Sequence, residues 1–305
     1  MKRFKLKIGK NNIYDINKET FEEKTKKQEP YIRVGKDKEK RCFAICPACD
    51  NPIQIIGLYK SIKVKPYGKH YNRSVEKLAV HNEQAYQFCP YASHIYSSVD
   101  KNRKKKEFTE YEARIYNLVR DNFDKALYIL KKDTGIHFTP KLAEKILFEY
   151  TASEGWMYPL ATIYNIPWML MYFAIGVNPY GWLIEKNSKL YKYLQTNKNI
   201  RLVEFNKNLV KIDTNSFIKM NYMFTKHRRT IINDEVIETI EVNLDENISK
   251  NPDEREWKFL WKDEIQINEH RFLNFVVSIK TEEYRNKKLL DIAEKIMPDI
   301  KSQAK

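Results

Sequence analysis

The feature that most constrains this chain is the stretch Cys46-Pro47-Ala48-Cys49. Two cysteines separated by two residues on a tight turn can both bind one metal ion, with Zn–S distances of about 2.3 Å. A largely apolar run, residues 41–45, precedes the turn, and a run typical of a β-strand, residues 52–59, follows it. A turn that carries two thiols between two strands is the pattern of half a zinc ribbon. The sequence therefore predicts a zinc-ribbon-like module around this turn.

A closed structural zinc site needs four ligands. Cys89 is the expected third ligand because it stands before Pro90 at a predicted turn. His70 is the preferred fourth ligand because it follows a predicted hairpin whose first strand leaves the Cys-x-x-Cys turn. The alternatives left open for this position are His81, which lies in a helix predicted over residues 74–88, His94 and Cys42. The predicted ligands of the structural Zn2+ are Cys46, Cys49, His70 and Cys89.

Other uses of the two cysteines fit the sequence less well. A redox-active Cys-x-x-Cys pair stands at the start of a helix in a βαβ setting. The residues that follow Cys49 instead have the composition of a strand. Structural zinc is therefore preferred over a redox pair and over free buried cysteines.

Positive charge is concentrated in the first third of the chain. The net charge of the whole chain is +15, and residues 1–110 hold 25 Lys and Arg against 13 Asp and Glu. A basic segment with a metal site indicates a polyanionic partner, most often nucleic acid. The expected phosphate contacts lie in the loop 63–73, where lysines alternate with tyrosines: Lys63, Lys65, Lys69 and Arg73. The simpler alternative is a solvated hairpin whose tyrosines are half buried.

The charge run at residues 101–106 suggests a domain boundary. We expect a basic N-terminal arm over residues 1–40, with a weakly ordered stretch at 22–28, a zinc-binding module over 41–100, and a helical and antiparallel β domain over 101–305. Four cysteines are too few for a disulfide scaffold, and the N-terminus lacks the apolar core of a signal peptide. A cytoplasmic protein is the resulting expectation.

Helical periodicity dominates the middle of the chain. One helix is predicted from Phe108 to about Lys132, with a capping box at Thr109, and a second begins at Pro140. Residues 155–184 contain no charged residue but are interrupted by Pro, Gly and Asn. This interruption favours one buried apolar helix at 168–175 over a membrane span, which needs about 20 apolar residues. A further helix is predicted over residues 182–194.

The last third of the chain is predicted to be antiparallel β-structure from about residue 201 to 281, with a hairpin turn at Asn233-Asp234 and a central strand at 273–279. A final helix at 282–297 is expected to cover one face of the sheet. The fold class is therefore α+β: a zinc-ribbon-like module, a central helical region, and a C-terminal antiparallel sheet closed by a helix.

The sequence has no Gly-rich phosphate loop and no nucleophile elbow. Pro252-Asp253 followed by Glu256-Trp257-Lys258 imitates a nuclease signature, but its carboxylates are too close in sequence to come from two strands. The basic cluster at residues 225–229 is expected at a solvated hairpin end. We therefore predict a zinc-containing protein that binds nucleic acid, DNA or RNA, with no assigned catalytic residue. The alternatives are a metal-dependent nuclease or other enzyme, and a scaffold subunit that binds a protein partner through residues 155–184.

Overall fold

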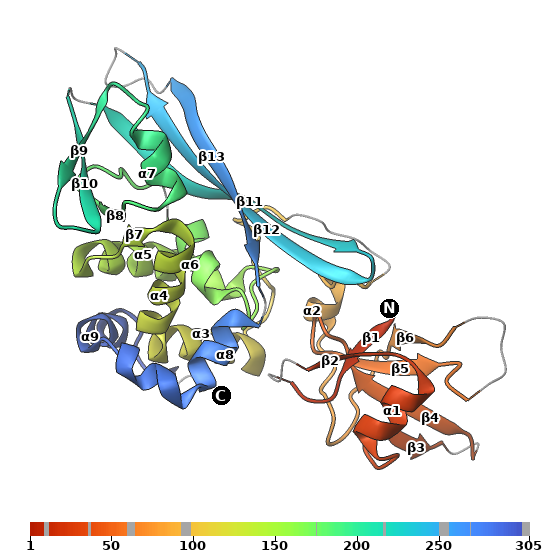
Figure 1. Cartoon of the computed structure of the whole chain (residues 1–305). Coiled ribbons are helices and arrows are strands. Elements are labelled where there is room, and N and C mark those ends of the chain that lie inside the picture. The colour runs from red at the N-terminus through yellow and green to blue at the C-terminus, as the bar shows by residue number, and fades with distance from the viewer. Residues whose placement is uncertain are drawn as a thin grey trace. The chain divides into compact units, whose positions relative to one another are not determined.

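The computed structural model describes residues 1–8, 12–35, 38–59, 65–92, 99–174, 176–215, 218–249, 256–268 and 270–300. Helices and antiparallel sheets are both present, so the protein is α+β (Figure 1). The chain divides into two compact units. The first unit is residues 1–99 with 229–237, and the second is residues 100–228 with 238–305.

The first unit is built on one antiparallel sheet with the strand order β2-β1-β4-β5-β6, to which β3 adds by pairing with β4. The strands are β1 (Arg3–Lys5), β2 (Ile13–Asp15), β3 (Ile32–Val34), β4 (Lys40–Ile45), β5 (Pro52–Ile56) and β6 (Tyr67–His70). Residues 1–40, expected as an arm, thus supply three strands of this sheet.

Helix α1 (Lys18–Thr25) lies where a weakly ordered stretch was predicted, so that prediction is wrong. The Asn17 side chain caps the helix by accepting a hydrogen bond from the Thr20 N–H at 2.8 Å. Phe21 is fully buried and packs against Phe4 of β1, with ring centroids 5.7 Å apart. The helix was not predicted because most of its residues are polar. Its main apolar contact with the sheet is the buried ring of Phe21.

The helix predicted over residues 74–88 is mostly absent. Val75 and Ala79 form a β-bridge around a turn, and Lys77 in that turn has a φ of 61°. Only α2 (Glu83–Gln87) is helical, and the Asn82 side chain caps it by accepting the Ala85 N–H. Residues 60–64, in the hairpin predicted before His70, lie outside the described residues.

The helices of the second unit begin at the predicted caps. Thr109 and Glu112 form the predicted capping box, and Gly135 ends the second helix with a φ of 72°. The single helix expected over 108–132 is two helices that meet at Asn122. The helices of this region are α3 (Glu110–Asp121), α4 (Phe123–Thr134), α5 (Pro140–Ala152) and α6 (Ile166–Phe173).

Residues 155–174 form part of the interior of the second unit. Every residue of α6 is buried, and so are Trp156 and Met157 of the short 3-10 helix η1 (Gly155–Met157). Most of the stretch is therefore buried, whereas Tyr180 beyond it is 57% exposed. Among the described residues, no helix has both the length and the apolar character needed to cross a bilayer.

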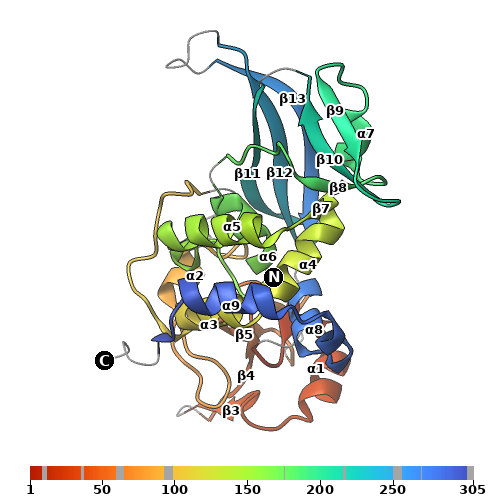
Figure 2. The ribbon, with the colours of Figure 1, turned by 90° about the vertical axis from the view of Figure 1, so that its left-hand side faces the viewer.

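Two sheets complete the second unit (Figure 2). One has the order β7-β8-β10-β9: β7 (Ile136–His137), β8 (Leu183–Glu185), β9 (Ile200–Glu204) and β10 (Leu209–Thr214). The other has the order β11-β12-β13: β11 (Lys219–Ile232), β12 (Glu235–Asn247) and β13 (Trp257–Ile267). The helix predicted over 182–194 is instead β8 followed by α7 (Lys189–Leu194), which the Ser188 side chain caps.

The predictions for the C-terminal segment were wrong in two places. The central strand expected at 273–279 is helix α8 (Arg271–Val277), followed by the 3-10 helix η2 (Ile279–Tyr284). A short apolar run fits a buried strand and a helix equally well. The final helix, α9 (Lys287–Ile296), packs against α5, α3 and α4, so it covers helices rather than a sheet.

Candidate metal centre

The Cys-x-x-Cys turn connects β4 and β5. The Cys46 N–H donates a hydrogen bond to the Asn51 carbonyl at 2.8 Å, and the Asp50 N–H donates to the Cys46 carbonyl at 3.2 Å. Asp50 has a φ of 58°, a left-handed conformation that Asp and Asn adopt more readily than most residues. These bonds fold the turn back on itself, so that both thiols lie on its inner side.

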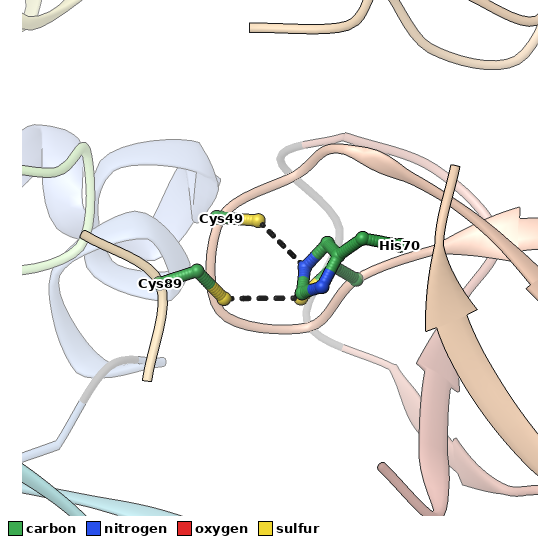
Figure 3. A group of neighbouring side chains, drawn as sticks. Cys49, His70 and Cys89 are labelled. Atoms are coloured by element: carbon green, nitrogen blue, oxygen red, sulfur yellow. Dashed lines mark hydrogen bonds between the residues drawn. The ribbon is translucent and has the colours of Figure 1, made fainter. Parts of the chain in front are cut away.

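Four side chains from three segments converge at this turn (Figure 3). His70 ends β6, opposite Ile53 of β5, and Cys89 follows α2. The Cys46 and Cys89 Sγ atoms are 3.7 Å apart, and Cys49 Sγ lies 3.3 Å from His70 Nε2. The ligand atoms of Cys46, Cys49, His70 and Cys89 all lie within 4.8 Å of one another. The four predicted ligands are thus close enough to hold one metal ion.

The spacing of these atoms fits a tetrahedral ion. With Zn–S bonds of about 2.3 Å, tetrahedral geometry places two sulfurs about 3.8 Å apart. The observed 3.7 Å between Cys46 and Cys89 matches this value and is far too long for a disulfide of about 2.05 Å. Thiolate sulfur and imidazole nitrogen are the ligands that structural zinc sites use. The donor set and the spacing are therefore compatible with zinc.

A second layer of contacts supports the ligands. The Asn51 amide donates to Cys49 Sγ at 3.4 Å and to the Asn82 carbonyl at 3.0 Å, and its oxygen accepts the Asn82 N–H at 2.7 Å. Asn51 therefore joins the Cys-x-x-Cys turn to the segment that leads into α2 and Cys89. The Tyr86 ring packs edge-on against the His70 ring, with centroids 5.0 Å apart. Contacts of this kind fix the orientation of metal ligands.

A buried ion pair holds the turn from its other side. Lys5 of β1 binds the carboxylate of Asp50, the residue after Cys49, and the two side chains are 2% and 5% exposed. Lys5 pairs with Ile45 at the end of β4, so the ammonium group lies directly beside the turn. The position of Asp50, and with it the approach of Cys49, depends on this pair.

The cluster strongly perturbs its own protonation. Burial raises the pKa values of Cys49 and Cys89 well above the ordinary value, and hydrogen bonding to Cys46 raises them further. Burial alone would also raise the Cys46 pKa, but hydrogen bonds from the other three side chains outweigh it and hold that pKa well below its usual value. Deprotonation of all three, which metal binding requires, needs a bound cation to compensate the charge.

The rival ligands lie elsewhere or are not described. Cys42 is buried on β4 opposite Ile55, and burial raises the pKa of its thiol to about 11. His81 Nε2 contacts the Glu83 carboxylate at 3.1 Å. His94 lies outside the described residues.

The residues predicted to contact phosphate flank His70 in the sequence. Lys69 precedes this ligand on β6, and Lys65, Lys69 and Arg73 are all exposed, whereas Lys63 lies outside the described residues. Of the alternating tyrosines, Tyr67 is 41% exposed, and Tyr71 packs edge-on against Phe43. These three basic side chains are thus exposed on the segment of the chain that also carries His70.

The nuclease-like signature and the basic cluster at residues 225–229 are not part of the metal cluster. The nuclease-like signature begins at residues 252–255, which lie outside the described residues. The basic cluster 225–229 is not a solvated hairpin end, because His227 and Arg229 are 1% and 5% exposed. His227 Nε2 lies 2.6 Å from the Glu238 carboxylate, which also accepts a hydrogen bond from Asn165 at 2.6 Å. The Glu238 contacts were missed because Glu238 and Asn165 are 73 residues apart and carry no local motif.

Comparison of the chain with protein-family models, with curated proteins and with solved structures found no match.

Proposed function

We propose that the first unit is a structural zinc module, of zinc-ribbon-like type, that binds nucleic acid through its phosphate backbone. The observation that carries the proposal is the position of His70. It belongs to the metal cluster, and it lies on the same strand as the exposed Lys69 and shortly before Arg73. A metal that fixes His70 therefore also fixes the basic segment around it.

The zinc half of the proposal rests on the donor set. Four protein ligands close a tetrahedral site and leave no position for a substrate or water, so the role is structural and not catalytic. When bound, zinc would hold all three thiols as thiolates and join the β4–β5 turn to β6 and to the Cys89 segment. The residues that hold it are Cys46, Cys49, His70 and Cys89.

Metal analysis of the purified chain tests this half. We expect one zinc ion per chain, and tetrahedral thiolate spectra when Co2+ replaces it. Cys89→Ser should lose most of the metal. Cys42→Ala is the matched control, because it removes a cysteine that is also buried in the first unit but lies outside the cluster. Equal metal content in the two variants would contradict the assigned ligands.

The nucleic-acid half rests on charge. Residues 1–99 contain 20 Lys and Arg and 10 Asp and Glu. Lysine and arginine side chains that contact phosphates release counterions, so the logarithm of the affinity falls with the logarithm of salt concentration by about 0.9 per contact on duplex DNA. Contacts from Lys65, Lys69 and Arg73 alone would give a slope of about −2.7.

Fluorescence anisotropy with labelled single-stranded and duplex oligonucleotides, titrated with salt, tests this half. Lys69→Gln/Arg73→Gln should weaken binding and reduce the magnitude of the duplex slope by about 1.8. Lys192→Gln/Lys198→Gln removes the same charge from exposed positions in the second unit and should leave the slope unchanged. Binding that is insensitive to salt, or equal effects of the two double variants, would contradict the proposal. The same samples incubated with Mg2+ test the alternative of a nuclease.

A further inference from the structure

The tip of the β11–β12 hairpin, residues 229–237, belongs to the first unit although the strands on both sides of it belong to the second. We propose that metal binding at the Cys46, Cys49, His70 and Cys89 cluster controls the docking of this hairpin tip. This inference rests on the proposed metal binding and extends it, because it gives the metal a conformational role beyond the module's own stability. It also makes Arg229 a positioning residue of the metal centre.

The first contact is with the Cys-x-x-Cys turn itself. Arg229 is 5% exposed, and its Nη2 donates a hydrogen bond to the carbonyl of Ala48 at 3.3 Å. Ala48 lies between the two cysteines of the turn. The hydrogen bond from Arg229 to this carbonyl therefore depends on the conformation of the turn, and the same conformation brings Cys46 and Cys49 to one ion. Hydrogen bonds that involve a charged group are among the stronger ones.

The second contact is with the segment that carries Cys89. Tyr91, two residues after this ligand, donates its hydroxyl hydrogen to the backbone carbonyl of Asp234 at 2.6 Å. Val236 of the tip packs against the hydrophobic cluster that includes Cys46, Cys49 and Cys89. The tip thus touches both segments that bring cysteines to the metal site.

The tip also makes exposed ion pairs with β1 and with the residue before it. Lys2 pairs with Asp234 at 2.5 Å, and Arg3 pairs with Glu235 at 2.7 Å, with Lys2 and Glu235 more than half exposed. Exposed pairs of this kind contribute little. Among these contacts, those of Arg229 and Tyr91 and the packing of Val236 are the buried or partly buried ones, and the proposal rests on them.

The turn at the tip is determined by its own residues. Loss of the metal would therefore change the contacts of the tip with the two cysteine segments and would leave the turn itself intact. Asn233 and Asp234 have φ values of 50° and 62°, as a two-residue hairpin turn of type I′ requires. By contrast, the two surfaces that receive the tip lie about 40 residues apart in the sequence, and the metal ligands join them directly. The Asn51–Asn82 hydrogen bonds also join these surfaces and do not require the ion.

The hairpin continues into the second unit, where it is held separately. His227 and Glu238 flank the tip and form a buried pair there, with Nε2 and the carboxylate oxygen 2.6 Å apart. The strands on both sides of the tip are thus held by a contact that does not involve the metal cluster, so loss of the metal is expected to affect the tip and not the second unit.

Hydrogen exchange of the full chain, loaded with one equivalent of Zn2+ or treated with a chelator, tests the proposal. We expect peptides that cover residues 229–237 to exchange at least tenfold faster after chelation, while peptides from α4 and α5 exchange unchanged. Unchanged protection of the tip, with loss of the metal confirmed by elemental analysis, would overturn the inference and leave the metal site intact. A chain that never takes up metal would instead overturn the proposed function and the inference with it.

The reciprocal test measures metal release, because coupling acts in both directions. Arg229→Ala should accelerate zinc transfer to a chelating dye about tenfold, and Tyr91→Phe, which removes one hydroxyl, should accelerate it several-fold. Arg228→Ala is the matched control, since this neighbouring arginine is exposed and lies outside the tip. Equal release rates for the Arg229 and Arg228 variants, with Tyr91→Phe unchanged from the parent, would refute the coupling.

Discussion

Replacement of Lys5 by Met should destabilise the first unit by about 4 kcal/mol. Methionine preserves the apolar stem of the side chain but leaves the Asp50 carboxylate without the ammonium group. The Lys5 and Asp50 side chains are 2% and 5% exposed, and this burial determines the size of the expected loss of stability. Removal of one partner of an exposed pair costs about 0–1 kcal/mol, whereas removal of one partner of a buried pair costs about 3–5 kcal/mol.

A second substitution separates the charge effect from simple loss of packing. Asp50→Asn removes the buried charge, and Asn tolerates the left-handed conformation at φ 58°. The Lys5→Met/Asp50→Asn variant should therefore recover at least half of the lost stability, about 2 kcal/mol, by the same buried-charge argument. Neither variant alters a proposed metal ligand, so both should still bind metal, with lower affinity in Lys5→Met because Asp50 follows Cys49.

The two units can be followed separately in one experiment. All five tryptophans, at positions 156, 168, 182, 257 and 261, belong to the second unit. Tryptophan fluorescence in urea therefore reports the second unit, and hydrogen exchange of β4 and β5 peptides across the same titration reports the first. With a slope of about 2 kcal/mol/M, a loss of 4 kcal/mol shifts the midpoint of the first unit by about 2 M. A loss below 1 kcal/mol, or no recovery in the double variant, would refute the role of the ion pair.

Four further predictions concern the metal site and the two cores. Chelation should lower the unfolding temperature of the first unit by more than about 15 °C, measured by exchange of its sheet peptides, with unchanged tryptophan emission. Since burial raises the Cys42 pKa to about 11, this thiol should remain protonated and resist alkylation at pH 8 in the native protein, which mass spectrometry of alkylated peptides can check. The buried Tyr150 hydroxyl has no hydrogen-bond partner among the described residues, so Tyr150→Phe should leave stability unchanged or raise it by about 1 kcal/mol in thermal unfolding. In the same assay Gly155→Ala should cost about 1–3 kcal/mol, because its Cβ would lie 2.2 Å from the Tyr150 ring.

The metal cluster was predictable from the sequence because its signals are local and chemically specific. Cys-x-x-Cys spacing predicts two ligands on one turn, and a further cysteine or histidine near a predicted turn is a natural partner. The supporting residues were not predictable in the same way. Lys5 precedes Asp50 by 45 residues, and Arg229 follows Ala48 by 181 residues, so only the fold reveals that they meet.

The fold was predictable to the extent that caps and turns determine it. Thr109, Pro140, Gly135 and the Asn233-Asp234 turn all occupy the positions that their backbone chemistry predicts. The predictions failed where a short apolar run had no such marker. Residues 273–279 contain Val, Ile and Phe and resemble a strand, but packing of α8 against α4 makes them largely helical. No local sequence pattern indicates that the tip of the β11–β12 hairpin belongs to the first unit and the rest of the hairpin to the second.

The positions of the four candidate ligands along the chain favour a structural role for the proposed ion. Cys49, His70 and Cys89 lie about 20 residues apart, so one ion closes two successive loops of that length. In the chain-entropy model, closing a loop of 20 residues restrains the unfolded chain by about 3 kcal/mol. Two such loops contribute an amount comparable to the whole stability of a small domain, about 5–15 kcal/mol. An ion held by these four ligands would restrain enough of the chain to act as part of the first unit's core, so its removal is expected to affect the hairpin tip as well as the sheet.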